Sequence, residues 1–374
     1  SVLTLPQIND TSSDHQYVFA VNELAADRTV TLPLLTGADE FTFNAHTQTL
    51  TNKTLTTPVI NGAFTGTATP PLTFYSTNFN APEGFLLNGK IVPSVASNNL
   101  TVAIKTNSGA DPSAASPVYV MMGGTLRSIT GALTTGAILA GNNYLNMGGA
   151  GLATKEVDLF AYLQFQSSDS TVQLLFSRLP FATIMSDFYN TGTPATNEKG
   201  YLSSGTVPAT GSDTVVNIGR FAATLSAGAG HTWTVPTFTT KNLIQRPIYE
   251  TRPLNFVPSP TGFTGTPTVS FARYKIFGSS MYVATLFNGT SNAADCNITL
   301  PLAPKTANSL YAAYTTPTQD NGVWGNGVVG FLEGSATAKF GDAASTISSN
   351  TYGGFATSGS KAANLSVILE IETS

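Results

Sequence analysis

Charged side chains are scarce in this sequence, at 10% of its 374 residues, against roughly 25% in an average soluble protein. The 17 Lys and Arg residues and the 21 Asp and Glu residues leave a net charge of −4. Without a basic excess, a protein lacks the electrostatic attraction that drives binding to nucleic acids and anionic membranes. We therefore expect no nucleic-acid partner.

Cysteine is almost absent, because Cys296 is the only one. A single thiol forms neither an internal disulfide nor a thiolate metal site, and we expect Cys296 to be a small buried apolar residue. No apolar run approaches about 18 residues, so no membrane insertion is expected. The first residues also lack the basic and apolar regions of a secretory signal, which suits assembly in a cytoplasm.

Helical periodicity is nearly absent, whereas alternation of apolar and polar residues is frequent. Apolar residues make up 41% of the chain, with 34 Gly and 21 Pro residues between the alternating runs, and Thr is the commonest residue. Period two is typical of half-buried strands, and Gly, Pro and Asn clusters mark the turns between them. The pattern predicts an all-β fold, with strands that include residues 100–104, 159–165, 172–176 and 365–371.

The texture of the sequence changes along the chain and divides it into three regions. A proline-rich stretch at residues 246–267 is predicted to be a connector or an edge strand, because proline cannot donate to a ladder. The first region holds one hydrophobic strand pair, at residues 17–24 and 29–35. We predict an N-terminal segment with a shaft at residues 1–72, a central β-sandwich at 73–245 and a distal β-sandwich at 246–374.

The Thr-rich tract at residues 47–69 has few apolar residues, chiefly Leu50, Leu55 and Ile60. One strand with so few buried side chains does not offset the ordering entropy of about 1–2 kcal/mol per residue. Three copies around a shared axis would pool these side chains, with His46 near that axis. A disordered Thr-rich linker is the alternative interpretation.

This tract also carries a resemblance. Residues 26–33, ADRTVTLP, and 46–60, HTQTLTNKTLTTPVI, resemble the N-terminal part of bacteriophage fibre proteins. Residues 84–90 and 99–105 look like a domain that often follows it, and residues 271–274 are similar to distal fibre β-domains. The resemblance implies a homotrimer in the virion, attached to tail or capsid proteins through its N-terminal segment. Its β-domains would contact a host cell-surface glycan or protein.

The fold implied by this resemblance is an extended β segment and a thin Thr-rich trimeric shaft, followed by two jelly-roll-like β-sandwich domains. The implied function is that of a structural, non-enzymatic tail fibre for host attachment. The alternatives are a capsid head fibre or decoration protein, and a glycan-cleaving tail spike. The chain lacks the long parallel-helix repeats of such spikes, and His46-Thr47-Gln48 stands where some fibres hold iron through His-x-His.

Two acidic pairs lie at i and i+2 spacing, Glu156 with Asp158 and Glu370 with Glu372. On a strand such a pair shares one face, so it could chelate a cation or serve a glycosidase. A solvated edge that discourages strand pairing between molecules is the alternative that we favour. The sequence therefore predicts no catalytic, cofactor or metal site.

Receptor binding needs no motif, only exposed aromatic rings and polar neighbours. The predicted loop at residues 318–326 combines Trp324 with Asp320 and Asn321, and Tyr352 offers a second stacking surface. We predict these four residues as receptor contacts. Packing of Trp324 in the core or between subunits is the alternative.

Overall fold

The computed structural model describes some parts of the chain in full and others by backbone alone. Side chains are described for residues 81–135, 147, 151–168, 170–180, 213–226, 230–304, 314–331, 336–342 and 354–371, and only the backbone for 7–9, 16–18, 188–189, 200–202 and 312–313. Every regular element in these ranges is a β-strand, so the predicted all-β fold is confirmed. Among the same residues, no helix has the length and apolar character that crossing a membrane requires.

The chain divides into two compact units, residues 1–66 and 67–374. In the first unit, β1 (Gln7–Asn9) pairs antiparallel with β2 (Gln16–Val18). The predicted strand pair overlaps β2 at Tyr17 and Val18, and its other residues and the Thr-rich shaft lie outside the described residues. The predicted boundary between a central and a distal sandwich stays a prediction.

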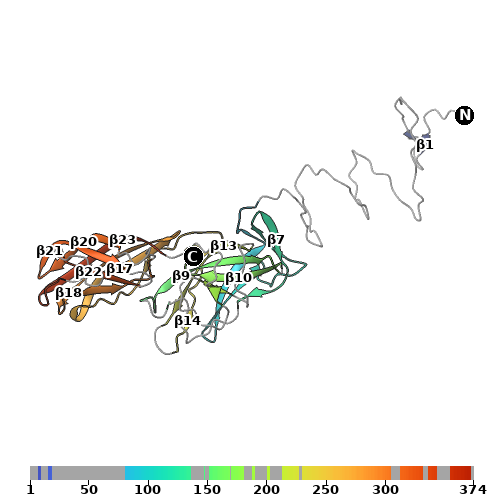
Figure 1. Ribbon diagram of the computed structural model, residues 1–374. Coiled ribbons are helices and arrows are strands. Elements are labelled where there is room, and N and C mark those ends of the chain that lie inside the picture. The colour runs from blue at the N-terminus through green and yellow to red at the C-terminus, as the bar shows by residue number, and fades with distance from the viewer. Residues whose placement is uncertain are drawn as a thin grey trace, which may run out of the picture. The chain divides into compact units, whose positions relative to one another are not determined.

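A seven-stranded sheet in the second unit centres on three long strands, β9 (Glu156–Gln166), β10 (Thr171–Ser177) and β13 (Thr214–Leu225), green to yellow in Figure 1. β9 pairs antiparallel with both of its neighbours. The register of β13 shifts at Gly219, where a Cβ atom would lie only 2.2 Å from the Ile244 carbonyl oxygen. The shorter strands are β11 (Phe188–Tyr189), β12 (Gly200–Leu202), β14 (Trp233–Thr234) and β15 (Leu243–Ile244).

Two three-stranded sheets lie against the seven-stranded sheet, through contacts of β5 with β14, β6 with β13 and β8 with β10. Val102 from these sheets and Leu159 of β9 belong to one buried cluster. The other face of β9 packs Phe160 and Tyr162, so β9 is buried on both faces and not half-buried as its sequence predicts. The strands are β3 (Leu86–Leu87), β6 (Val118–Met122) and β7 (Thr125–Ile129), and β4 (Gly89–Ala96), β5 (Asn99–Thr106) and β8 (Leu133–Thr134).

An eight-stranded antiparallel sheet, orange to red in Figure 1, follows in the chain. Thr261, two residues before β17, forms an isolated bridge with Asn297 of β19, the last strand in the sheet order. The sheet therefore curls until its far strand meets the entry to β17. In spatial order the strands are β16 (Leu254–Asn255), β17 (Phe263–Phe277), β18 (Ser280–Ser291), β23 (Ser360–Glu370), β20 (Ala312–Asp320), β21 (Val323–Phe331), β22 (Thr337–Gly341) and β19 (Cys296–Thr299).

Burial along β23 alternates as the sequence predicts. Leu365, Val367 and Leu369 are buried, whereas Ser366 and Ile368 are exposed. One face of this strand therefore contributes to the core and the other faces solvent, which is what period two requires of a half-buried strand.

The proline-rich stretch at residues 246–267 contains both structures that the sequence predicts. Most of it connects strands, and β16 lies at the edge of the sheet order. Pro267 falls inside β17, where the register shifts between Thr264 and Thr268. A proline has no N–H for the ladder, and an irregular stretch of strand accommodates that loss.

Candidate functional site

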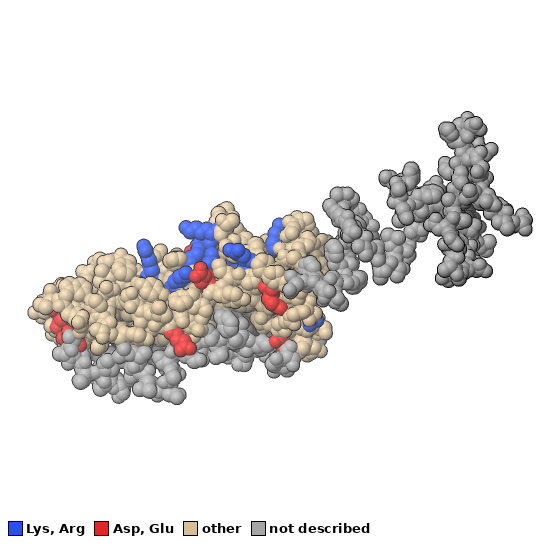
Figure 2. All heavy atoms as spheres, turned by 90° about the horizontal axis from the view of Figure 1, so that it is seen from above, with Lys and Arg blue, Asp and Glu red and all other residues tan. Residues whose placement is uncertain are grey.

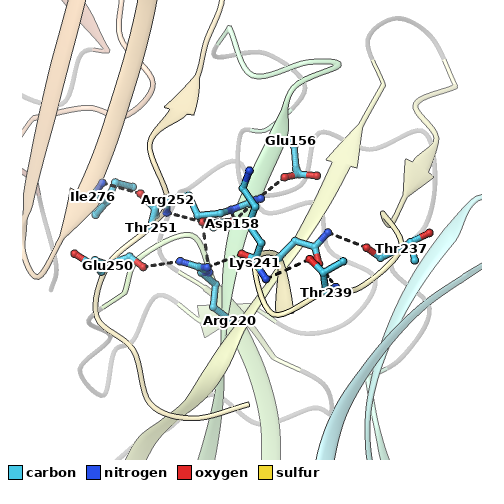
Figure 3. Close-up of polar contacts among 11 residues, drawn as sticks. Glu156, Asp158, Arg220, Thr237, Thr239, Lys241, Glu250, Thr251, Arg252 and Ile276 are labelled. Carbon is cyan, nitrogen blue, oxygen red and sulfur yellow. Dashed lines mark hydrogen bonds and ion pairs between the residues drawn. The ribbon is translucent and has the colours of Figure 1, made fainter. Parts of the chain in front are cut away.

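Four ion pairs between described residues of distant segments converge where three segments of the second unit meet (Figure 3). These segments are the start of β9, the turn at residues 239–242, and the connector at residues 250–255. Arg220 reaches the same place from β13. The charged members are Glu156, Asp158, Arg220, Glu250, Arg252 and Lys275, and we call them the ion cluster.

Asp158 lies at the centre of the ion cluster, with no exposed side-chain surface. Arg252 donates to it from Nη2 at 2.5 Å and from Nε at 3.0 Å, and the Arg252 backbone N–H donates at 2.8 Å. The Nε atom of Arg220 lies 3.5 Å from Oδ2. Buried carboxylates persist when they are paired and hydrogen-bonded in this way.

The two arginines hold the surrounding segments in place. Arg220 donates to the backbone carbonyls of Glu250 at 3.2 Å and of Lys241 at 2.9 Å, and Arg252 Nη2 also lies 2.5 Å from Glu156 Oε1. Burial lowers the pKa of Arg220, although Asp158 opposes the shift. Burial also acts to lower the pKa of Arg252, but the hydrogen bonds to Asp158 and Glu156 outweigh it, so the pKa of Arg252 is raised.

Glu156 and Asp158 both contact Arg252, as expected for i and i+2 residues on one face of a strand. Asp158 has no access to solvent, and Glu156 is 37% exposed. A general acid or a nucleophile must reach its substrate, so this geometry favours an internal ion pair that joins β9 to the connector. It differs from the solvated edge that the sequence predicts, because the pair is held by arginines from distant segments. Of the second pair, Glu370 is exposed and Glu372 lies outside the described residues.

A pocket of about 440 Å³ lies beside the ion cluster. Its polar and charged lining comes from Lys155 and Glu156 of β9 and its approach, from Lys241 of the turn, and from Arg252 and Asn255 of the connector. Pro253 and Leu254 complete the lining. The pocket therefore presents three cationic side chains and one carboxylate to solvent.

The structure places Trp324 on a strand and not in a loop, so the predicted loop at residues 318–326 is wrong. β20 and β21 form a hairpin in which Gln319 pairs with Trp324. Its two-residue turn is Asn321-Gly322, with φ of 45° and 85°, the combination that a tight type I′ turn requires.

Trp324 is 52% exposed, so the core-packing alternative does not describe it in this chain. Asp320 accepts a hydrogen bond from the Ala356 N–H at 2.8 Å, which fixes one of its oxygens. The structure therefore places Trp324, Asp320 and Asn321 at one hairpin end, but Trp324 pairs with Gln319 and Asp320 with Val323, so Trp324 and Asp320 point to opposite faces. Tyr352 lies outside the described residues.

The predicted shaft contacts, Leu50, Leu55, Ile60 and His46, also lie outside the described residues and stay predictions. Cys296 is a buried free thiol as expected, and burial raises its pKa to about 12. Within the described residues, no group of three or more His, Cys, Asp or Glu side chains is placed to hold a metal ion.

Arg220, Arg252 and Lys241 are not among the site residues that the sequence predicts. Arg220 carried a usable signal, because it stands between Gly219 and Phe221 in a mostly apolar strand, and a charge in such a place needs a buried partner. Arg252 and Lys241 carried none, since their role depends on tertiary contacts with β9 and β13.

Comparisons with known proteins give no relative. No protein-family model, no curated protein and no solved structure matches this chain.

Proposed function

We propose that this chain is a structural virion fibre protein of a bacteriophage, a trimeric tail fibre that mediates host-surface attachment. The observation that carries the proposal is the tract at residues 46–60, whose HTQTLTNKTLTTPVI phrase resembles those of virion fibres. The all-β fold and the low content of charged residues are consistent with it.

The energetics of the Thr-rich tract support a trimer. Leu50, Leu55 and Ile60 are five residues apart, so each copy offers about one large apolar side chain per five residues for burial. Such a side chain contributes about 1.5–3 kcal/mol when fully buried, whereas ordering five backbone residues costs about 5–10 kcal/mol. In a trimer, the apolar side chains of the three copies would be buried against one another, and hydrogen bonds would form between chains. A lone strand has neither contribution.

Host contact is assigned to the exposed end of the β20–β21 hairpin. Trp324 is 52% and Val323 73% exposed there. An exposed indole is suited to stacking on a sugar ring. Its cross-strand partner Gln319 shares its face and can bond sugar hydroxyls, whereas Asp320 pairs with Val323 on the other face of the hairpin.

A non-enzymatic role is supported by the ion cluster. Of the two carboxylates that could serve a glycan-cleaving spike, Asp158 is buried and paired with two arginines, and Glu156 is bound by one of them. Turnover of host polysaccharide by the full chain, abolished by Glu156→Gln, would favour the spike over the fibre.

The trimer is tested by light scattering of the purified full chain. We expect trimers from the unmodified chain and monomers from a Leu50→Asp/Leu55→Asp variant, because the charges would lie inside the bundle. Thr51→Asp/Thr56→Asp adds the same charges at positions that the proposed bundle places outward, and it should leave the trimer intact. A monomeric unmodified chain contradicts the proposal.

Labelling of intact particles with an antibody to the chain, followed by electron microscopy, tests the position in the virion. Label at the tail supports the tail fibre, and label on the capsid favours the head fibre or decoration protein. Particles without label in either position contradict both.

A further inference from the structure

The pocket beside the ion cluster has more positively charged side chains than negatively charged side chains to pair with them. Arg252 and Arg220 face two carboxylates, Glu156 and Asp158, so these four groups cancel. Lys155 lines the same pocket with Lys241. Neither ammonium group has a hydrogen-bond or ion-pair partner among the described residues, which leaves an excess of two positive charges.

This excess is unusual for the protein as a whole. Only 10% of the residues are charged and the net charge is −4. In Figure 2 most of the described surface carries neither sign, while Lys and Arg side chains gather along one edge of the view. Two positive charges that line one pocket repel each other, and a bound anion offsets that repulsion.

The backbone that carries these lysines is fixed before any ligand arrives. The carbonyl of Lys241 accepts from Arg220 at 2.9 Å, and Asn242 closes the turn by accepting from the Thr239 N–H at 2.7 Å and donating to the Thr237 carbonyl at 2.9 Å (Figure 3). The N–H of Lys155 donates to the Leu152 carbonyl at 2.9 Å. A preorganised site loses less entropy on binding.

The neutral and acidic groups of the pocket narrow the ligand class. Glu156 uses Oε1 for Arg252, and at 37% exposure it still offers acceptor capacity to solvent. A carboxylate accepts from hydroxyl groups and repels a bare anion, and the exposed Asn255 amide both donates and accepts. A volume of about 440 Å³ lies in the range of small-molecule sites.

We propose that this pocket binds a saccharide that carries an anionic oxyacid group, a carboxylate or a phosphate, with Lys155 and Lys241 holding the anion and Glu156 and Asn255 bonding sugar hydroxyls. This proposal rests on the proposed function, because host-surface attachment is what exposes the chain to such sugars. It adds a second contact site with a chemistry different from that of the Trp324 hairpin.

Isothermal titration of the full chain with four small probes tests the ligand class. We expect glucuronate and glucose 6-phosphate to bind more tightly than glucose or inorganic phosphate, and the difference between the two anionic sugars identifies the preferred oxyacid. Added salt should weaken binding, since the lysines are near solvent. Equal binding of glucose and glucuronate, or no binding of either anionic sugar at tens of millimolar, overturns the proposal.

Substitution of the lysines tests the site. Lys155→Gln and Lys241→Gln should each weaken binding of the preferred sugar about two- to fivefold, and the pair about tenfold, as expected for partly exposed ion pairs. Lys90→Gln/Lys339→Gln removes the same charge outside the pocket lining and should leave affinity unchanged. Unchanged affinity in the pocket double variant contradicts the assignment.

The titration is independent of oligomeric state and of position on the virion. Specific binding by a chain that proves monomeric would retain the pocket and reject the fibre. A trimer on the virion that ignores anionic sugars would retain the fibre and reject the pocket.

Discussion

Replacing Asp158 with asparagine keeps the shape of the side chain but removes the charge at the centre of the ion cluster. In the folded protein this carboxylate has no exposed surface, and it accepts from the side chain and the backbone of Arg252. An asparagine presents an NH₂ group to donors that need an acceptor. Arg220, which lies 3.5 Å from Oδ2, also loses its counter-charge.

The magnitude follows from burial. Breaking a buried ion pair by removing one partner costs about 3–5 kcal/mol, because the other charge is left uncompensated. Glu156→Gln removes a carboxylate that also binds Arg252 but is 37% exposed, and such a pair contributes about 0.2–1 kcal/mol. With a urea dependence of about 2 kcal/mol/M, we expect Asp158→Asn to lower the unfolding midpoint by about 1.5–2.5 M and Glu156→Gln by about 0.5 M or less.

The assay uses one of the two tryptophans. Trp233 is 1% exposed, and it pairs with Leu225 of β13, the strand that also carries Arg220. Trp324→Phe removes the second fluorophore from an exposed strand position, so urea titration in that background follows Trp233 alone. Both acidic variants are compared in the same background.

The two acidic variants together test whether the pair is structural. If Asp158→Asn lowered the urea unfolding midpoint no more than Glu156→Gln does, the reasoning would be refuted, because the ion pairs of Asp158 with Arg220 and Arg252 would then contribute little stability. Loss of a glycan-cleaving activity in both variants, with stability unchanged, would instead assign the pair to catalysis.

Three further predictions concern the eight-stranded sheet. Because folding raises the pKa of Cys296 from 9.0 to about 12, the folded state holds the thiol proton more tightly. Stability should therefore fall as pH rises from about 9 toward 12, by about 2–3 kcal/mol at pH 11, and urea titrations of Cys296→Ala should lack that fall. The buried Lys361 ammonium donates to the carbonyls of Gly262 at 3.0 Å and Asp295 at 2.9 Å. Lys361→Met leaves both carbonyls without a donor, so it should speed thiol labelling of Cys296 at least about tenfold. An unchanged labelling rate would contradict this prediction. A Cβ on Gly262 would lie 1.9 Å from the Asp295 carbonyl oxygen, whereas a Cβ on Gly278 would meet no atom within 4 Å. Gly278→Ala should therefore cost only about 1 kcal/mol of backbone strain. Gly262→Ala should lower the melting temperature well beyond the effect of Gly278→Ala.

Local sequence was enough to predict the strands at residues 100–104, 159–165, 172–176 and 365–371. The alternation at residues 365–371 gave both the strand and its buried face, because in β23 only one face meets a core. The run at residues 159–165 gave the strand but not its environment. In β9 the supposedly polar face is covered as well, where Phe160 and Tyr162 pack with Leu175, and that depends on elements distant in sequence.

The predicted loop at residues 318–326 is longer than the turn of the hairpin at Trp324. Asn321-Gly322 is the strongest short-range signal for a two-residue hairpin turn, and the predicted loop is followed by Gly327 and also contains Gly325. The ladder of β20 and β21 runs through both glycines, since backbone pairing does not need side chains. The ion cluster was out of reach for another reason, because its arginines come from positions 62 and 94 residues beyond Asp158 and no spacing rule connects them.

The most direct test of the account is the native mass of the full chain in solution. We expect a single species of three times 39.0 kDa that persists on dilution. A species of 39.0 kDa at every concentration would contradict the account, because Leu50, Leu55 and Ile60 would then have no partner chains to bury them.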